Sequence, residues 1–282
     1  MGVNHLEDVL QYLDQTISHA LPVLVAFVRE ETQKAGFSDV VFGLSGGIDS
    51  AVVAYLAVEA LGADRVHPLI MPYQTSSPAS LEDARKVAEA LELKAKVVDI
   101  TPQIDAYFAH QEQASPLRKG NKMARERMTI IYDHSVIYRA LPLGTSNKTE
   151  LLLGYGTQFG DLASAINPIG DLYKTQIRKV ASQLGVPQSI LTKPPSADLW
   201  EAQTDEDELG FTYDEADVVL HLLVDDRFSP AEVVEAGFSL ELVTVIMRRM
   251  MQNQYKRRPP LIAKVSSRTI GIDFRYPRDW GM

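Results

Sequence analysis

The residues best suited to chemistry form a glycine-rich turn, Ser45-Gly46-Gly47-Ile48-Asp49-Ser50. The two glycines let backbone N–H groups approach phosphate oxygens without a Cβ clash, and the serine hydroxyls add hydrogen-bond donors. A helix that begins at the turn would direct the positive end of its dipole toward the same anion. Because the Asp49 carboxylate would repel a bare phosphate, a divalent cation is expected between them. The turn therefore predicts a phosphate–metal site, although it matches neither the GK[ST] loop nor the G-x-G-x-x-G fingerprint.

Such a turn needs a strand before it and a helix after it, and the sequence provides both. Apolar residues 40–44 precede the turn, and a largely apolar segment at 51–61 follows it. Further strands are predicted at 66–71, 95–100, 141–145 and 166–169. Strands that alternate with helices form a parallel sheet with right-handed crossovers, which binds ligands at the carboxyl ends of its strands. We therefore expect a doubly wound, Rossmann-like α/β fold, with a five-stranded parallel sheet, helices on both faces and a helical C-terminal end.

The other segments are mostly predicted to be helical. An apolar stripe at helical spacing predicts helices over residues 5–33, and the stripe would serve core packing or a contact with a second copy of the chain. Residues 110–122 and 193–210 are polar and lack periodicity, so both are predicted to be loops. We expect 110–122 and 198–210 to become ordered over bound substrate. Further helices are predicted at 80–91, 121–139, 173–184, 213–223, 230–236 and 240–254. Gly185 is expected to end the helix that begins at 173.

Composition limits the class of protein. The chain has 282 residues, 45% hydrophobic and 23% charged, which is typical of soluble globular proteins. Its net charge of −9 argues against a duplex-binding surface, so we expect no nucleic-acid partner. No long apolar run predicts a membrane helix, and the polar N-terminal residues do not resemble a secretory signal; a cytoplasmic protein is expected. The chain contains no cysteine, which excludes disulfides, Cys-ligated metals and a Cys nucleophile.

The turn resembles the pyrophosphate-binding loop (PP-loop) of the ATP pyrophosphatases, which split ATP by adenylating a substrate oxygen. Within that superfamily, the other motifs look like ammonia-dependent NAD synthetase, and they occur in the family's order over most of residues 25–260. The matching segments are 120–128, 143–145 with Glu150, 154–161, Pro168, 174–176, 193–199, 203–206 and 256–257 with Pro259. This resemblance implies an adenine nucleotide alpha hydrolase-like fold and one domain over 1–282. Its parts would be N-terminal helices (1–33), a nucleotide-binding α/β core (38–185), and a substrate loop with C-terminal helices (193–282).

The implied reaction is ATP-dependent amidation of deamido-NAD (nicotinic acid adenine dinucleotide), through an acyl-adenylate, to give NAD, AMP and pyrophosphate. A carboxylate is a poor acyl electrophile, so a good leaving group must be installed before ammonia attacks. Because the chain has no cysteine to hydrolyse glutamine, the expected nitrogen donor is ammonia, taken free or supplied by another polypeptide. The resemblance also implies Mg²⁺ bound with ATP and a homodimer. Two alternatives remain: another PP-loop ligase with a different substrate, and a nucleotide-binding sensor without turnover.

The resemblance assigns roles to individual residues. Asp49 and Glu150 would hold magnesium. Arg125, Lys256 and Arg257 would contact deamido-NAD, with Arg127 as the alternative to Arg125. The residues expected to bind ATP are Gly43, Leu44, Ser45, Gly46, Gly47, Ile48, Asp49, Ser50, Thr145, Lys174 and Ser196.

Asp161 and Lys174 are the expected catalytic residues. Lys174 would neutralise phosphate charge, and Asp161 would hold ammonium and accept its proton, because ammonium itself is not nucleophilic. Three positions depart from the family pattern. Gln158 and Ala165 stand where some members have Lys and Asp, and Tyr255 stands where many have His. The departures leave the ATP chemistry intact and indicate different contacts to the dinucleotide.

Overall fold

The computed structural model describes residues 5–111, 114–196 and 204–274. Its sheet has four parallel strands in the order β3-β2-β1-β4. The strands are β1 (Asp39–Gly43), β2 (Val66–Ile70), β3 (Lys96–Val97) and β4 (Ala140–Pro142). The parallel α/β architecture is confirmed, but the expected count of five strands is wrong. Residues 166–169 contribute only a single bridge, between Leu143 and Ile166, because Pro168 has no N–H group with which to extend a ladder.

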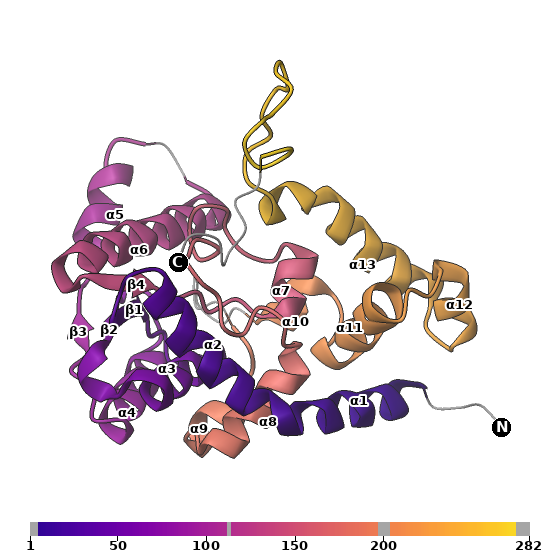
Figure 1. The fold of residues 1–282 in the computed structure, drawn as a ribbon, viewed down its shortest axis with the longest axis horizontal. Coiled ribbons are helices and arrows are strands. Elements are labelled where there is room, and N and C mark those ends of the chain that lie inside the picture. Colours follow the sequence, from indigo (N-terminus) through magenta and orange to yellow (C-terminus); the bar gives the residue numbers. More distant parts are fainter. Residues whose placement is uncertain (1–4, 112–113, 197–203, 275–282) are drawn as a thin grey trace.

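Side chains of β1 alternate between two apolar cores, as a strand covered on both faces requires. Val40 and Phe42 lie in the core that also contains α2, α3, α4 and α8. Val41 lies in the opposite core, with residues of α5 and α6. All three side chains are fully buried. The sheet is thus held rigidly between two helical layers (Figure 1).

The helices around the sheet are α2 (Ala20–Lys34), α3 (Ile48–Leu61), α4 (Pro78–Ala90), α5 (Thr101–Phe108), α6 (Pro116–Tyr138), α8 (Lys174–Leu184) and α9 (Gln188–Leu191), with the 3₁₀ turn η2 (Ala63–Arg65). The predicted loop over 110–122 is wrong in its second half, because α6 begins at Pro116. Ser115 caps that helix by accepting a hydrogen bond from the Arg118 N–H at 3.3 Å, and proline favours the first helical position. Gly185 ends α8 in the left-handed conformation, as predicted.

A third apolar core joins the N-terminal helix to the C-terminal helices. Its elements are α1 (His5–Thr16), α7 (Lys148–Leu153), α10 (Asp205–Leu209), α11 (Tyr213–Leu220), the π-helical turn η3 (His221–Asp225), α12 (Pro230–Glu235) and α13 (Leu240–Gln252), followed by the 3₁₀ turn η4 (Gln254–Arg257). The predicted N-terminal stripe divides at the 3₁₀ turn η1 (Ile17–His19): Leu13 packs in this third core, whereas Leu21, Leu24 and Phe27 pack on the sheet side. Most of the stripe therefore serves packing within the chain.

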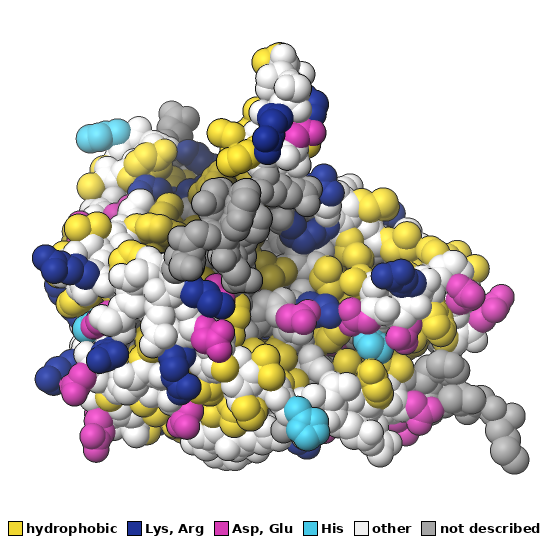
Figure 2. Space-filling model, in the orientation of Figure 1, with side chains coloured by type: hydrophobic (Ala, Val, Ile, Leu, Met, Phe, Trp, Pro, Cys, Tyr) yellow, Lys and Arg dark blue, Asp and Glu magenta, His cyan; other side chains and the backbone are white. Residues whose placement is uncertain are grey.

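In Figure 1 the sheet and its helices form one half of the molecule, α11–α13 form the other, and α7 and α10 lie between them. Residues 258–274 extend beyond α13 as an arm (yellow in Figure 1). On the face drawn in Figure 2, Lys and Arg side chains are interspersed with Asp and Glu. None of the helices in the described ranges is long and apolar enough to cross a membrane.

Candidate functional site

The glycine-rich turn connects β1 to α3 and packs tightly against the start of α4. Gly46 has φ +82°, and a Cβ atom at this position would lie 2.0 Å from the carbonyl oxygen of Ser80. Only glycine avoids both the strain and the clash. The Ser45 and Ser50 hydroxyls lie 3.0 Å apart, and Ser50 also donates to the Gly47 carbonyl at 3.0 Å. These bonds fix the turn so that Asp49 stands in the first turn of α3.

The end of β4 brings a second carboxylate to the same edge of the sheet. Residues after β4 lead into α7, where Asn147 and Glu150 form a capping box. The Asn147 side chain accepts from the Glu150 N–H at 2.9 Å and donates to an Asp49 oxygen at 3.0 Å. Asn147 is fully buried. It therefore links the two predicted metal ligands, a role the sequence analysis missed because a capping residue carries no long-range signal.

Lys174, the first residue of α8, lies between these carboxylates. Its Nζ atom is 2.5 Å from Asp49 Oδ2 and 3.6 Å from Glu150 Oε1, and its side chain is only 3% exposed. Burial and the charge of Asp49 raise the pKa of Glu150 to about 8, against the opposing effect of Lys174. Burial lowers the pKa of Lys174, but the charges of Asp49 and Glu150 outweigh it, so its pKa lies above the usual value. The three predicted residues thus form one charge cluster, with a buried Lys174 between two partly exposed carboxylates.

Asp205 is a fourth charged residue near this cluster, and no role was assigned to it from the sequence. It is 4% exposed and accepts hydrogen bonds from the Tyr155 and Tyr213 hydroxyls, each at 3.1 Å. The Lys174 ammonium lies 5.3 Å from the centroid of the Tyr213 ring. Burial raises the pKa of Asp205, and the positive charge of Lys174 opposes that rise. The matching segment 203–206 was the only sequence signal for this residue.

The expected loop at 193–210 is anchored at both of its described ends. Lys193 donates to the Ser80 hydroxyl at 2.9 Å and lies 3.4 Å from the Asp83 carboxylate. The Asp205 N–H donates to the Pro195 carbonyl at 3.0 Å. Ser196 directly follows this contact. Residues 197–203, which include the end of the 193–199 motif and the first residue of the 203–206 motif, lie outside the described residues.

A second group of predicted residues surrounds the loop at 154–161. Asp161, which is exposed, accepts a hydrogen bond from the Thr157 N–H at 2.8 Å. Lys256 donates to the Gly154 and Gly156 carbonyls at 2.7 and 2.9 Å. Arg125, exposed on α6 rather than on the expected segment before a helix, donates to the Gln158 carbonyl at 3.2 Å. Three residues expected to handle deamido-NAD and ammonia therefore share one loop.

Two arginines have other positions. Arg257 donates to the Leu151, Leu152 and Met250 carbonyls at 3.1, 2.5 and 2.5 Å, so its guanidinium holds the C-terminal ends of α7 and α13. Arg127 donates to the Met71 carbonyl, just beyond β2, at 3.0 Å.

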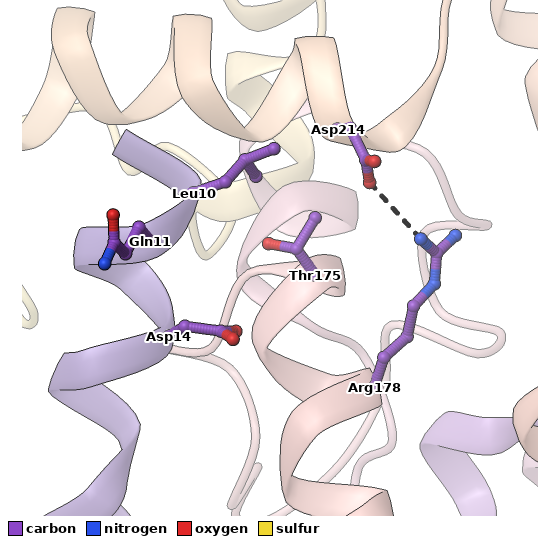
Figure 3. A pocket seen from close by; sticks show the side chains of 6 residues that line it. All are labelled: Leu10, Gln11, Asp14, Thr175, Arg178 and Asp214. Atoms are coloured by element: carbon purple, nitrogen blue, oxygen red, sulfur yellow. Dashed lines mark hydrogen bonds and ion pairs between the residues drawn. The ribbon is translucent and has the colours of Figure 1, made fainter. Parts of the chain in front are cut away.

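A pocket of about 320 Å³ lies away from these groups, between α1, α8 and α11 (Figure 3). Its lining residues are Leu10, Gln11, Asp14, Thr175, Arg178 and Asp214. Arg178 and Asp214 form an ion pair at 3.2 Å across its rim and are both well exposed. None of the predicted site residues lines this pocket, so it is separate from the chemistry described above.

The donor set fits magnesium. No cluster of three or more His, Cys, Asp or Glu side chains suited to a metal ion occurs among the described residues. Magnesium is commonly held by one or two carboxylates, with phosphate oxygens and waters completing an octahedron. Asp49 and Glu150 provide such a pair. Burial and the negative charge of Asp49 raise the pKa of Glu150, and a bound cation would favour its ionised form.

Comparison with known proteins identifies the family. The NAD synthase family model matches residues 20–260. The NH(3)-dependent NAD(+) synthetase of Trichlorobacter lovleyi is 58% identical over 92% of this chain and 95% of its own, and that of Chlorobaculum tepidum is 53% identical over 92% and 93%.

Two solved structures have the same fold. An NH3-dependent NAD synthetase from Campylobacter jejuni, in complex with the nitrate ion, superposes with a TM-score of 0.74 at 35% identity, covering 89% of this chain and 99% of that one. An NMN synthetase from Francisella tularensis superposes with a TM-score of 0.78 at 33% identity, covering 88% and 98%. The glycine-rich turn, the Asp49–Lys174–Glu150 cluster and these matches along most of the sequence lead to one conclusion: the chain belongs to the NAD synthase family.

Proposed function

We propose that this chain catalyses ATP-dependent amidation of deamido-NAD by ammonia, giving NAD, AMP and pyrophosphate. The observation that carries the proposal is the Lys174 ammonium held between Glu150 and Asp49, where Asp49 belongs to the glycine-rich turn that follows β1. A site with one buried cation between two partly exposed carboxylates suits a magnesium-bound triphosphate. The high identity to NH(3)-dependent NAD(+) synthetases supports the same reaction.

The first step makes the acyl-adenylate. The nicotinate carboxylate attacks the α-phosphorus of ATP, the bond from the α-phosphorus to the bridging oxygen breaks, and pyrophosphate leaves with the electron pair. In this proposal Gly43, Leu44, Ser45, Gly46, Gly47, Ile48, Asp49, Ser50, Thr145, Lys174 and Ser196 bind ATP. Lys174 exchanges its carboxylate partners for phosphate oxygens and neutralises the charge that gathers on pyrophosphate. Bound magnesium, held by Asp49 and Glu150, would supply further positive charge at the phosphates.

The second step forms the amide. Ammonia attacks the acyl carbon, AMP leaves, and nitrogen loses one proton. We assign Asp161 to hold ammonium and accept a proton, because it is an exposed carboxylate fixed by the Thr157 N–H. Arg125 and Lys256, which share the loop at 154–161, are proposed to contact deamido-NAD. Arg257 is also proposed to contact deamido-NAD. In addition, its hydrogen bonds to carbonyls at the ends of α7 and α13 hold these two helices together.

The proposal also covers organisation of the protein. One domain over 1–282 is proposed, with N-terminal helices (1–33), a nucleotide-binding core (38–185), and a substrate loop with C-terminal helices (193–282). A homodimer is proposed because α6 exposes the apolar side chains Tyr132, Val136 and Ile137, at 39, 78 and 60%. Sedimentation of a monomer at micromolar concentration would contradict the dimer.

Because the reaction draws on the ATP pool of the cell, we propose a cytoplasmic location.

One assay tests the reaction. Purified protein is given magnesium-ATP and ammonium, with and without deamido-NAD, and AMP and NAD are quantified by chromatography. Equal amounts of AMP and NAD, formed only with deamido-NAD, support the proposal. ATP binding without AMP release contradicts it and favours a nucleotide sensor. Glutamine in place of ammonium should give little product, because the chain has no cysteine nucleophile.

The likeness to an NMN synthetase gives a specific second candidate, in which the substrate is nicotinic acid mononucleotide. Both substrates carry the same nicotinate carboxylate and differ in the adenylate half of the dinucleotide. A direct comparison of kcat/KM for the two substrates separates the candidates. A higher value for the mononucleotide would replace the proposed substrate while keeping the adenylation chemistry.

A further inference from the structure

Two carboxylates from the C-terminal helices hold the starts of α7 and α8, the helices that carry Glu150 and Lys174. The first is Asp217 on α11, which is fully buried. It accepts a hydrogen bond from the Thr149 hydroxyl at 2.5 Å and another from the Thr175 N–H at 2.8 Å. One carboxylate therefore connects the residue before Glu150 to the residue after Lys174.

The second carboxylate is Asp225, the last residue of the π-helical turn η3. It accepts hydrogen bonds from the Lys148 ammonium at 2.9 and 3.0 Å and from the Tyr173 hydroxyl at 2.9 Å. Like Asp217, it connects one residue near Glu150 to one residue beside Lys174. Its His221 contact at 3.0 Å fixes the carboxylate within its own turn.

The Thr149 hydroxyl completes the connection between the two helices. While it donates to Asp217, it accepts a hydrogen bond from the Lys174 N–H at 3.0 Å. The first N–H groups of a helix have no partner inside the helix, and here Thr149 and Asp217 supply partners for the first two of α8. The helix α7 is only six residues long, so its own hydrogen bonds cannot hold its position.

A role in stability alone does not explain why a carboxylate is buried at Asp217. Burying a carboxylate is costly, and apolar residues of similar volume are often as stable or more stable in such places. Burial raises the pKa of Asp217 to about 6 despite the hydrogen bond from Thr149. The arrangement instead gives fixed geometry. A displacement of about 1 Å at a reacting group can cost on the order of 100-fold in rate.

We propose that Asp217 and Asp225 are positioning residues that set α7 against α8, so that Glu150 and Lys174 meet at the same phosphates. This inference rests on the proposed function, because the geometry it protects is that of the adenylation site. Neither carboxylate contacts Lys174, Glu150 or Asp49 through any hydrogen bond or ion pair found among the described residues. They act through Thr149, Thr175, Lys148 and Tyr173.

Thr149 offers the sharpest test, because its shape can be kept while its hydroxyl is removed. Thr149→Val deletes both hydrogen bonds with an isosteric side chain, and Thr149→Ser restores the hydroxyl. Tyr173→Phe removes one donor to Asp225 in the same way. Lys179→Met is the matched control, because it breaks an ion pair between α8 and Asp14 (3.1 Å) that is far more exposed. Full-length protein is used throughout.

The expected result is a loss of kcat for AMP formation of about 10- to 100-fold in Thr149→Val, with the KM for deamido-NAD changed less than threefold. Thr149→Ser should recover most of kcat. Tyr173→Phe should lose less than Thr149→Val, because Lys148 still holds Asp225. Lys179→Met should match the wild type. If Thr149→Val keeps the wild-type kcat and only melts at a lower temperature, the positioning role is wrong.

Amide hydrogen exchange tests the same connection without any turnover. In Thr149→Val the N–H groups of Lys174 and Thr175 should exchange at least tenfold faster, whereas those of α3 should be unchanged. Equal protection in Thr149→Val and wild type would overturn the proposal. If the wild type forms no AMP but Thr149→Val still shows the faster exchange at Lys174 and Thr175, the proposed function is contradicted and the connection between the helices is supported.

Discussion

The Lys174 ammonium lies 2.5 Å from a carboxylate oxygen of Asp49, although 125 residues separate them along the chain. The contact joins the turn after β1 to the start of α8. It also explains how a carboxylate can stand within a phosphate-binding turn. The buried ammonium of Lys174 balances the negative charge of Asp49. In the proposed reaction, magnesium would be held by the carboxylates and the ammonium would contact the phosphates of ATP.

Replacement of Lys174 by methionine should abolish most of the activity. The variant lacks the positive charge that Lys174 is proposed to place at the phosphates. We therefore expect kcat/KM for AMP formation to fall at least 100-fold, equivalent to about 3 kcal/mol. The control is Lys179→Met on the same helix, whose ion pair is well exposed. Steady-state AMP formation measures the effect. A loss below tenfold would show that Lys174 does not neutralise the charge on the departing pyrophosphate.

Gly46→Ala should destabilise the protein and weaken ATP binding. The new Cβ atom would meet the Ser80 carbonyl, and the residue would keep a left-handed φ of +82°. Gly62→Ala is a precise control, because Gly62 has φ +84° and nothing within 4 Å of the added atom. Both variants should lose about 1–3 kcal/mol from backbone strain, and only Gly46→Ala should lose more. Chemical unfolding gives the free energies; equal losses would contradict the clash.

The raised pKa of Glu150 predicts a specific pH dependence of stability. Because its pKa is about 8 in the folded protein and near 4.5 when unperturbed, the folded state binds this proton more tightly. The free energy of unfolding should therefore fall from about pH 4.5, where the unfolded chain loses this proton, to about pH 8, where the folded protein loses it too, and should level off above that. Magnesium should oppose that loss.

Glu150→Gln isolates this effect, because the amide does not titrate. Chemical unfolding at pH 6.5 and pH 9 in EDTA should show a smaller pH difference for the variant than for the wild type. Added magnesium should stabilise the wild type more at pH 9 than at pH 6.5, because metal binding needs the ionised carboxylate. An identical pH dependence in the two proteins would mean that Glu150 does not titrate in this range.

Arg257→Ala should reduce stability as well as activity. The side chain donates to carbonyls at the ends of α7 and α13, and its removal leaves those groups unpaired. We expect a loss of about 1–3 kcal/mol in the free energy of unfolding. Arg258→Ala, at the exposed neighbouring position, is the control. If Arg257→Ala changes only the KM for deamido-NAD, the residue serves substrate binding and not the helix ends.

The sequence by itself determined the parallel α/β fold, the glycine-rich turn between its first strand and the following helix, and the family. These features are local: strand and helix periods, a Gly-Gly pair between them, and motifs read in order along the chain. Helix ends were less accurate. Pro116 begins α6 because Ser115 caps it, whereas polar composition alone predicted a loop there. Residues 166–169 looked like a strand, but a strand also needs backbone partners, and Pro168 lacks the donor.

Only the tertiary structure decided which charges meet. Asn147 could be recognised as a helix cap, but not as the partner of Asp49. Asp205 joins the Lys174 cluster because α10 and α11 fold back over α7, and Asp217 and Asp225 hold two helix starts more than 40 residues away along the chain. In the sequence Arg257 is part of a basic run, whereas in the structure it donates hydrogen bonds to the ends of two helices, α7 and α13. Such contacts depend on how apolar faces pack, and packing brings together residues that no local pattern connects.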